Sequence, residues 1–477
     1  MKKLVTFASD LRLNALLCCS ATVLLTACGG GLTDTANGQQ AQTAAITTSA
    51  DATAANGAAT TPNTVDATAA QATDATPADF ALAGYDANPL AASTTDAAAP
   101  AATTDGAPHL LAMVTSVAPA SSMMSTPSTS YNYYVSPTGS DSAAGTQAAP
   151  FKTLARAAQV ATRAGTTVWV APGTYAGGIK TTASGTSSAR IYWVSTTKWG
   201  AKIVPPASSS NNNAWDNRGS YVSIIGFDVD GTNSGSGTKW THGIYTGGSY
   251  TMIADNHIHN IAKTVSCTSA GGSAIGVDSY YNGVLSDVVS NVVNDIGPAG
   301  CSYVQGIYFS TSGTIKNNLS YRVSGAAIHL WHDATNVTIT NNTATTSSFG
   351  LVVGGGDFYH STAGANNVFV ANNIVYDNQY GISEQGKTGT ANQYKNNLVY
   401  KNTTYNISLR NGLVATATVS SDPLLKAYSR TATTPDFHLS TSSPAIGRGI
   451  ATNAYPTDLD GKARNSTTGY DIGAYQH

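Results

Sequence analysis

The most regular feature of this chain is a short apolar and polar pattern that recurs along its second half. An apolar residue is followed three positions later by Asn and two positions further by a small or apolar residue, as in Ile253, Asn256 and Ile258. The Asn residues of successive copies are 35, 27, 24, 31 and 24 positions apart. The repeating unit is therefore about 24 residues long, with insertions between some copies. The six Asn positions are Asn256, Asn291, Asn318, Asn342, Asn373 and Asn397.

A second pattern runs in phase with the first. In most copies a Gly or Ala precedes an apolar residue that recurs once in every unit. Segments this short, with a period of two and no helical stripe between them, cannot form βαβ units. They predict a solenoid in which each coil stacks its strands in parallel on the next, with the Asn side chains hydrogen-bonded along the stack. The recurring apolar positions are Ile244, Ile275, Ile307, Ile328, Leu351, Ile382 and Ile407.

With these repeats, residues 131–477 resemble the right-handed parallel β-helix of the pectate-lyase-like superfamily. The resemblance implies an all-β fold, and leucine-rich repeats, the competing solenoid, have a Leu-rich consensus that is absent here. Residues 151–160 have apolar positions at helical spacing and predict a short helix in an N-terminal cap at 131–180. Residues 421–477 resemble the closing segment of such proteins, and we interpret their Asp residues as turn formers.

Residues 1–27 have the pattern of a signal peptide. Basic residues precede an apolar run at 13–25, which is shorter than a membrane-spanning helix needs. The run ends in Leu-Thr-Ala before Cys28, which resembles the bacterial lipoprotein box and implies a lipid anchor on this cysteine. A plain secretory signal with a chance cysteine is the alternative. Gly29 stands where the inner-membrane retention signal has Asp, which implies export to the outer membrane or cell surface.

Residues 28–130 predict a disordered tether. They contain eight Asp and no Lys, Arg or Glu, and they have too few large apolar residues to offset the entropy of ordering. Only 10% of the whole chain is charged and its formal charge is -2, which gives no support to nucleic-acid binding. When the eight acidic residues of the tether are left out, the net charge of residues 131–477 is slightly positive. A positive net charge suits an acidic polymer as partner.

Two cysteines fall in insertions between neighbouring coils. They are Cys267 and Cys301, and export to an oxidising compartment favours a disulfide between them. Two free thiols are the alternative. We expect the bridge to pin two long loops together.

Side chains that point outward from the predicted coils form columns, because alternate residues of a strand face opposite sides. Aromatic rings beside hydrogen-bonding groups are what a sugar needs, since its faces are apolar and its hydroxyls polar. The predicted partner is therefore a polysaccharide; the alternative is that these side chains merely cover the sheet. One column is Tyr245, Gly276, Tyr308, His329, Val352, Ser383 and Ser408, and the next is Gly247, Asp278, Ser310, Trp331, Gly354, Gln385 and Arg410.

A further outward column carries Asp230, His259 and Asn294, with Asp228 stacked on His257. We interpret it mainly as structural stacking. Several carboxylates could in principle hold Ca²⁺ through their oxygens, namely Asp278 with Asp228, Asp230 and Asp255, although they belong to different strand columns.

Three classes of function compete for the first two columns. A lyase or epimerase needs a base, a proton donor and a group that neutralises the uronate carboxylate. We predict His329 as the base and Tyr308 as the proton donor. The neutralising group is Arg410, Arg322 or His332, and Asp278 is a further catalytic residue. The residues predicted to contact substrate are Trp331, Tyr245, His242, Asp333, Gln385 and Glu384.

A glycoside hydrolase instead needs two carboxyl groups about 5 to 9.5 Å apart, and Asp278 with Asp333 or Glu384 are the options. The paired-Asp and Gly-His-Gly signatures of polygalacturonases are missing, and so is the calcium cluster of calcium-dependent pectate lyases. A non-catalytic polysaccharide-binding or structural surface protein is the third class. We predict a monomeric polysaccharide lyase or epimerase acting on an acidic polymer.

Overall fold

The computed structural model describes residues 131–477 apart from 209–210, 233–238, 465–466 and 468. The predicted signal peptide, the tether and Cys28 lie outside the described residues. The described part belongs to one compact unit, Asp74–His477. Within the described ranges, no helix combines the length and apolar character needed to cross a bilayer.

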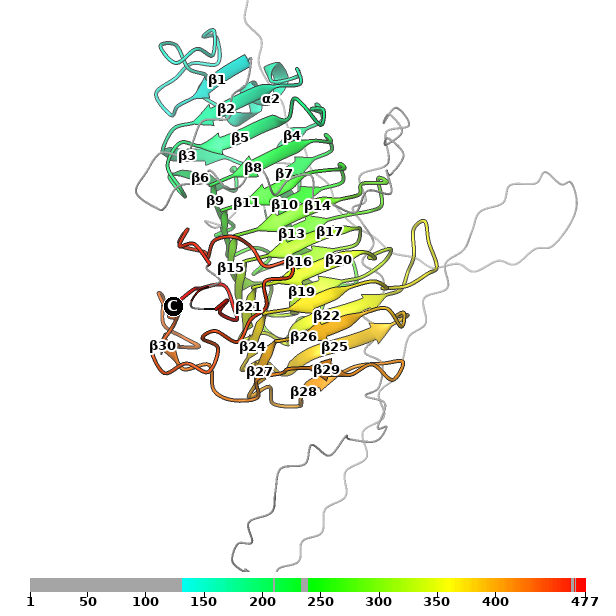
Figure 1. Cartoon of the computed structure of the whole chain (residues 1–477). Helices are drawn as coiled ribbons and strands as arrows, with labels where there is room; N and C mark the ends of the chain where they lie inside the picture. The colour runs from blue at the N-terminus through cyan, green and yellow to red at the C-terminus, as the bar shows by residue number, and fades with distance from the viewer. Residues whose placement is uncertain (1–130, 209–210, 233–238, 465–466, 468) are drawn as a thin grey trace, which may run out of the picture. The chain divides into compact units, whose positions relative to one another are not determined.

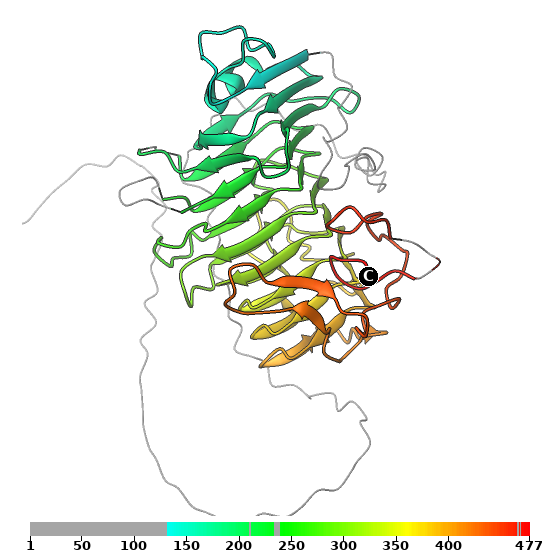
Figure 2. The same cartoon turned by 90° about the vertical axis from the view of Figure 1, so that its left-hand side faces the viewer.

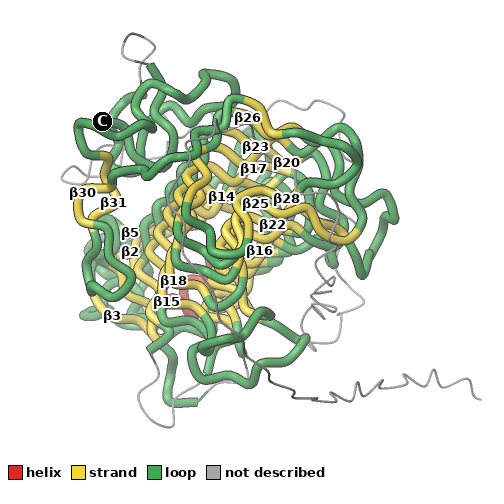
Figure 3. The backbone as a smooth tube through the Cα atoms, turned by 90° about the horizontal axis from the view of Figure 1, so that it is seen from below, coloured by secondary structure: helices red, strands yellow, loops and turns green. Residues whose placement is uncertain are grey.

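The chain winds through three parallel sheets in a fixed order, one strand from each sheet per coil (Figure 1). A typical coil runs from β8 (Val222–Ile225) to β9 (Asp228–Asp230) and β10 (His242–Thr246), after which β11 (Met252–Ala254) pairs with β8. Viewed from below, the strands of successive coils follow one another in depth (Figure 3). This arrangement is the predicted right-handed parallel β-helix.

From β2 to β29, each of the three sheets takes every third strand of the chain, and β1 adds one further strand at the end of sheet A. Sheet A consists of β1 (Tyr131–Val135), β2 (Thr166–Val170), β5 (Ile191–Ser195), β8, β11, β14 (Ser286–Val289), β17 (Gly313–Lys316), β20 (Val337–Thr340), β23 (Phe369–Ala371), β26 (Gln393–Lys395) and β29 (Ala415–Thr416). Sheet B consists of β3 (Gly173–Ala176), β6 (Ala201–Val204), β9, β12 (His257–His259), β15 (Val292–Ile296), β18 (Leu319–Val323), β21 (Thr343–Thr345), β24 (Ile374–Tyr376) and β27 (Leu398–Tyr400). Sheet C consists of β4 (Ile179–Thr181), β7 (Asn213–Asn217), β10, β13 (Gly272–Val277), β16 (Val304–Phe309), β19 (Ala326–Leu330), β22 (Phe349–Gly355), β25 (Tyr380–Gly386) and β28 (Tyr405–Ser408).

The predicted inward column of sheet C is confirmed by the register of its strands. Ile244 pairs with Ile275, and each later member pairs with the next as far as Ile407. Six of the seven are fully buried, and Ile407 in the last coil is half-buried. Stacked apolar side chains of similar size therefore fill the interior of the coils, and their burial is the main favourable contribution to folding.

The predicted Asn ladder is also confirmed, at the bend between sheets A and B. The side-chain Nδ2 of Asn256 donates to Oδ1 of Asn291 at 3.1 Å, and the next four steps measure 3.0, 2.9, 2.9 and 3.0 Å. The residue before each ladder Asn has a positive φ, for example 60° at Asn317 before Asn318. This left-handed residue turns the chain sharply, and the amides satisfy the backbone groups that the turn leaves without a strand partner.

Additional segments cover the first coils and one side of the stack. The helix α2 (Leu154–Val160) buries Leu154 and Ala157, and the Thr153 hydroxyl accepts the Arg156 N–H at its start. Residues 421–477 contain the antiparallel pair β30 (Leu425–Ala427) and β31 (Asp436–Leu439). This closing segment does not stop at the last coil: its Phe437 packs on Tyr321 of β18, so it runs back along the outer face of sheet B (Figures 1 and 2).

The predicted disulfide is confirmed. Cys267 and Cys301 are bonded, with their Cα atoms 5.6 Å apart. The bond joins the insertion between β12 and β13 to the insertion between β15 and β16, and Cys301 is buried in the core.

We expect replacement of both cysteines by serine to lower the free energy of unfolding by about 3 to 4 kcal/mol, because the bridge closes a loop that spans 34 residues. Urea unfolding of the Cys267→Ser/Cys301→Ser variant against the wild type measures the difference. Wild-type protein unfolded with a reductant present is the control and should match the variant. An unchanged unfolding midpoint in both would contradict the prediction.

Candidate functional site

The outer face of sheet C carries the predicted cluster of aromatic and titratable side chains. Tyr245 pairs with Gly276, Gly276 with Tyr308, and Tyr308 with His329, so these positions form one column across four strands. Trp331 follows β19 directly and its ring lies 5.6 Å from that of His329. The alignment of the predicted columns is therefore confirmed, while the chemical roles assigned to these residues stay predictions.

His329 has an unusual environment at the centre of this face. It is 1% exposed, and neither of its ring nitrogens has a hydrogen-bond partner among the described residues. Its ring contacts Tyr308 edge to face, with centroids 5.3 Å apart. Burial, aided by the nearby His332, lowers the pKa of His329 to about 3. The imidazole is therefore neutral at physiological pH and has a lone pair available to accept a proton.

Asp278 is hydrogen-bonded to three residues of the cluster. Its carboxylate accepts hydrogen bonds from the Tyr245 hydroxyl at 2.6 Å, the Ser310 hydroxyl at 2.9 Å and the Tyr280 N–H at 3.0 Å. Burial and this carboxylate together raise the pKa of Tyr245 well above its usual value. Beside it, the ring of His242 lies edge-on to Tyr245 at 5.4 Å. Tyr245 thus contacts Asp278 directly, and His242 contacts Tyr245.

A chain of hydroxyl groups links Asp278 to Asp333. The Ser310 hydroxyl that donates to Asp278 lies 3.3 Å from the Ser279 hydroxyl, which donates to Asp333 at 3.1 Å. Asp333 also accepts the backbone N–H of His360 at 3.1 Å. Two carboxylates are therefore held on the same face, separated by two serine hydroxyls.

The sequence analysis did not predict three residues of this site, Asp357, Tyr359 and His360, which all lie in the insertion after β22. His332 donates from Nδ1 to the carbonyl oxygen of Asp357 at 2.7 Å and accepts at Nε2 from the Tyr359 hydroxyl at 2.8 Å. His360 Nε2 lies 2.8 Å from the carbonyl oxygen of Ser279. The spacing of 31 between two ladder asparagines marks this insertion in the sequence, but not where it folds. Burial lowers the pKa of His332, so the ring is a neutral bridge.

Glycines around Trp331 leave room for its ring to pack closely against neighbouring coils. A Cβ atom added at Gly354, Gly356 or Gly386 would come within 2.6 to 2.8 Å of the indole. The indole N–H donates to Asp357 at 3.3 Å. The glycine-rich end of β22 is therefore a slot for Trp331.

The remaining predicted residues lie on the following coils. Gln385 donates to the Ser383 hydroxyl at 3.1 Å on the outer face. Arg410 donates to the carbonyl oxygen of Gly386 at 3.2 Å, next to the Trp331 slot. Glu384 is 3% exposed and its carboxylate accepts from the core residue Tyr394 at 2.8 Å, so the structure does not bring it onto the outer face. Its predicted contact with substrate stays untested.

Arg322 lies elsewhere. Its guanidinium forms a two-pronged ion pair with Asp295 at 2.8 and 2.7 Å, in sheet B. Sheet C therefore retains Arg410 and His332 as the predicted groups that could neutralise a carboxylate.

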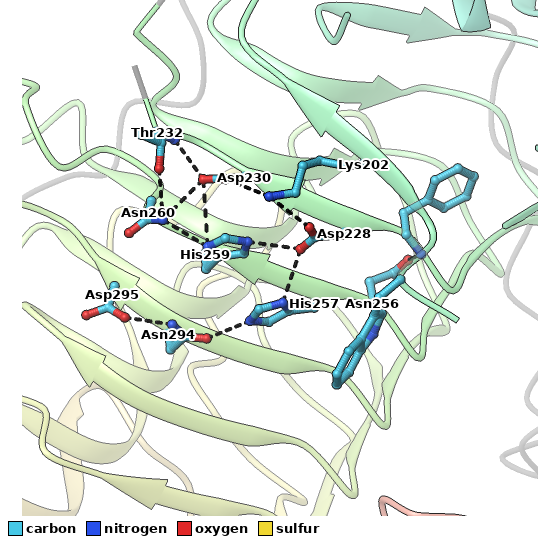
Figure 4. Close-up of polar contacts among 12 residues, drawn as sticks. Lys202, Asp228, Asp230, Thr232, Asn256, His257, His259, Asn260, Asn294 and Asp295 are labelled. Atoms are coloured by element: carbon cyan, nitrogen blue, oxygen red, sulfur yellow. Dashed lines mark hydrogen bonds and ion pairs between the residues drawn. The ribbon is translucent and has the colours of Figure 1, made fainter. Parts of the chain in front are cut away.

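The group that could hold a metal ion among the described residues is Asp228, His257 and His259, on sheet B (Figure 4). The aspartates considered for Ca²⁺ are not brought together: Asp278 follows β13 of sheet C, whereas Asp228 is in β9. Nitrogen donors suit transition metals rather than Ca²⁺, which prefers oxygen.

Comparisons with known proteins place this architecture among β-helices. Residues 133–293 match the family described as Pel9A-like, right handed beta helix region. The uncharacterized protein YwoF of Bacillus subtilis strain 168 is 29% identical over 315 residues, which cover 58% of this chain and 63% of that protein. This chain thus spans less than two thirds of the length of that relative.

Two of the similar solved structures are named as enzymes that act on polysaccharides. Pectate lyase Pel9A is 17% identical with a TM-score of 0.43, and the match covers 75% of this chain and 99% of that one. The A-module of mannuronan C-5 epimerase AlgE4 from Azotobacter vinelandii is 16% identical with a TM-score of 0.38, covering 56% of this chain and 75% of that one. Residues 133–293 are thus similar to the Pel9A-like right-handed β-helix family, and the order of the described strands is that of a right-handed parallel β-helix.

Proposed function

We propose that the outer face of sheet C binds an acidic polysaccharide and acts on it by proton abstraction, as a lyase or an epimerase. The observation that carries the proposal is His329, a neutral buried imidazole set between Tyr308 and Trp331, for whose two nitrogens the described residues supply no hydrogen-bond partner. An unpaired buried polar group costs stability, so its presence calls for a functional explanation. The Pel9A-like match supports the substrate class, since the name Pel9A belongs to a pectate lyase.

In the proposed reaction, a nitrogen of His329 takes the proton on the carbon next to the uronate carboxylate. In a lyase, the electrons of that C–H bond form a C=C bond and the glycosidic C–O bond breaks. Tyr308 gives its proton to the leaving oxygen, and burial keeps this phenol protonated because it raises the pKa well above its usual value. In an epimerase, the glycosidic bond stays intact and Tyr308 instead gives its proton to the opposite face of the same carbon.

Arg410 is the residue that we assign to the uronate carboxylate. It lies beside the Trp331 slot, whereas His332 has both ring nitrogens engaged with Asp357 and Tyr359. A cation held near the carboxylate stabilises the negative charge that develops when the proton leaves. Because Tyr359 packs against Tyr308 and Trp331, substrate reaches His329 only when these covering side chains shift.

A glycoside hydrolase is the second candidate, and one observation favours it. Asp278 and Asp333 are joined through the hydroxyls of Ser310 and Ser279, which places two carboxylates on one face. Such a pair could act as acid and as base or nucleophile.

Export and attachment through a lipid on Cys28 belong to the same proposal and rest on the sequence pattern alone. They would present a monomeric β-helix at the cell surface, where polysaccharides are available.

The test is to incubate the purified chain with a panel of acidic and neutral polysaccharides. A lyase yields an unsaturated product that absorbs in the ultraviolet together with new reducing ends, whereas a hydrolase yields reducing ends alone. An epimerase changes the uronate configuration seen by NMR without cleavage. Binding without any product would leave a polysaccharide-binding protein, and the absence of both binding and product across the panel would overturn the proposal.

A further inference from the structure

The outer face of sheet B is polar where β9 and β12 lie. Further along, the closing segment covers this sheet and packs on Val292, Leu319 and Tyr321. Asp228 and Asp230 of β9 stand directly beside His257 and His259 of β12, as the strand register requires (Figure 4). Outward residues two apart on one strand share a face, so both imidazoles and both carboxylates meet there.

Three donor atoms converge at this place. Oδ1 of Asp228 lies 3.1 Å from Nδ1 of His257 and 2.9 Å from Nε2 of His259. All three atoms lie within 4.8 Å of one another, and the two rings are stacked with centroids 4.2 Å apart. Bonds of about 2.0 to 2.1 Å to one tetrahedral ion separate its ligands by about 3.3 Å. The two oxygen-to-nitrogen distances here, 3.1 and 2.9 Å, are close to that value.

A histidine that binds a metal through one ring nitrogen usually donates the N–H of its other nitrogen to an acceptor, and His257 has such an acceptor in Asn294. Nδ2 of Asn294 donates to Asp295 at 2.6 Å, so Oδ1 of this amide faces Nε2 of His257 at 2.9 Å. A carbonyl oxygen only accepts, and Nε2 therefore carries a proton. In the neutral ring, the lone pair is then on Nδ1 and points at Asp228. Arg322 fixes Asp295 in turn through the ion pair described above.

Lys202, on the other side of the cluster, does not occupy Oδ1 of Asp228, so this oxygen can bind an ion. Lys202 binds the second oxygen of Asp228, Oδ2, at 3.3 Å and Asp230 at 3.0 Å. Nδ1 of His259 accepts from Asn260 at 2.9 Å and lies 3.7 Å from Oδ1 of Asp230. When an ion binds Nε2 of His259, the single proton of the neutral ring moves to Nδ1, which then donates instead of accepting, and Asp230 is the carboxylate nearest to it.

We propose that Oδ1 of Asp228, Nδ1 of His257 and Nε2 of His259 bind one divalent first-row transition-metal ion, for which zinc is the probe. Two imidazoles and one carboxylate match the ligand preference of such ions and not that of Ca²⁺ or Mg²⁺. The ion would bridge the neighbouring coils that contain β9 and β12. Its fourth position would face outward, since the His257 side chain is 25% exposed.

The experiment is a zinc titration of the purified full chain after removal of metals with a chelator and dialysis. We expect the wild type to bind one zinc ion at this cluster and to show a raised unfolding temperature. In Asp228→Asn and His259→Gln, which keep the side-chain size, this binding should be lost. Asn294→Leu removes the partner of His257 and should weaken zinc binding by about 10 to 100-fold.

His438→Gln is the matched control. His438 also lies between carboxylates, Asp436 and Asp460, but outside the proposed cluster, so its replacement should leave zinc affinity unchanged. The Co²⁺ complex gives a second readout in the wild type, since its visible absorption reports imidazole and carboxylate ligands. Trp199, whose ring lies 5.1 Å from that of His257, should lose fluorescence when Cu²⁺ binds, and Trp199→Phe should abolish that change.

Failure of the wild type to bind zinc in a defined ratio would overturn the proposal, whatever the variants do. Equal zinc binding in the wild type and in Asp228→Asn would overturn it as well. Neither result bears on the sheet C function, because the two faces share no residue.

Discussion

Replacement of His329 by leucine should abolish turnover of the polysaccharide without unfolding the protein. Loss of a catalytic base costs about 10² to 10⁴-fold in rate. Because neither ring nitrogen of His329 has a hydrogen-bond partner in the part of the chain that the structure describes, an apolar side chain of similar size should leave the free energy of unfolding unchanged or increase it. Rates on the best substrate of the panel, together with urea unfolding, measure both effects.

Substrate affinity separates the possible outcomes of this substitution. Retained binding with lost turnover supports His329 as the base. The control variant His438→Gln replaces a half-buried histidine of the closing segment and should keep full activity. Unchanged turnover in His329→Leu would remove this residue from the mechanism. In that case, lost turnover in both Asp278→Asn and Asp333→Asn would favour the hydrolase.

Replacement of Asn318 by alanine should lower the free energy of unfolding by about 4 kcal/mol, because several buried polar groups lose their partners at once. Its Oδ1 accepts the backbone N–H and the side-chain amide of Asn291 at 2.9 and 3.0 Å. Its Nδ2 donates to Asn342 and to the carbonyl oxygen of Val288, each at 2.9 Å. Water cannot reach these groups to replace the amide, since Asn318 is fully buried. Urea unfolding followed by circular dichroism measures the loss.

Asn406→Ala is the matched control for the ladder. Asn406 ends a second, shorter ladder by accepting from Asn402 at 3.0 Å, but it is exposed, so water can take its place. We expect a loss of about 1 kcal/mol or less. If Asn318→Ala lowers the free energy of unfolding no more than Asn406→Ala does, the ladder does not stabilise the fold.

The repeat explains how much of the fold was predictable. Every coil repeats one local pattern, and stacking in parallel brings equal positions together whatever the rest of the chain does. The period alone therefore aligned Tyr245, Tyr308 and His329, and it paired the ladder asparagines. The cysteines were predictable because adjacent coils carry both insertions.

Insertions do not follow the repeat, and for that reason the covering of the site was not predictable. The segment with Tyr359 and His360 folds over His332 and Ser279 through contacts that no spacing encodes. The inward position of Glu384 follows from the repeat itself. Glu384 lies between the outward residues Ser383 and Gln385, so alternation directs it inward, where its carboxylate accepts a hydrogen bond from Tyr394.

The sequence by itself thus determined the β-helix, the columns on each sheet and the disulfide, because these depend on periodicity and on which residues occupy adjacent coils. Only the tertiary structure decided which of these side chains become chemically distinctive. Burial keeps the imidazole of His329 neutral, with no hydrogen-bond partner among the described residues, and the turn of two imidazoles toward one carboxylate oxygen brings Asp228, His257 and His259 together as the donor set proposed for a metal ion. Both depend on desolvation and on side-chain direction, which arise only when distant coils and loops pack together.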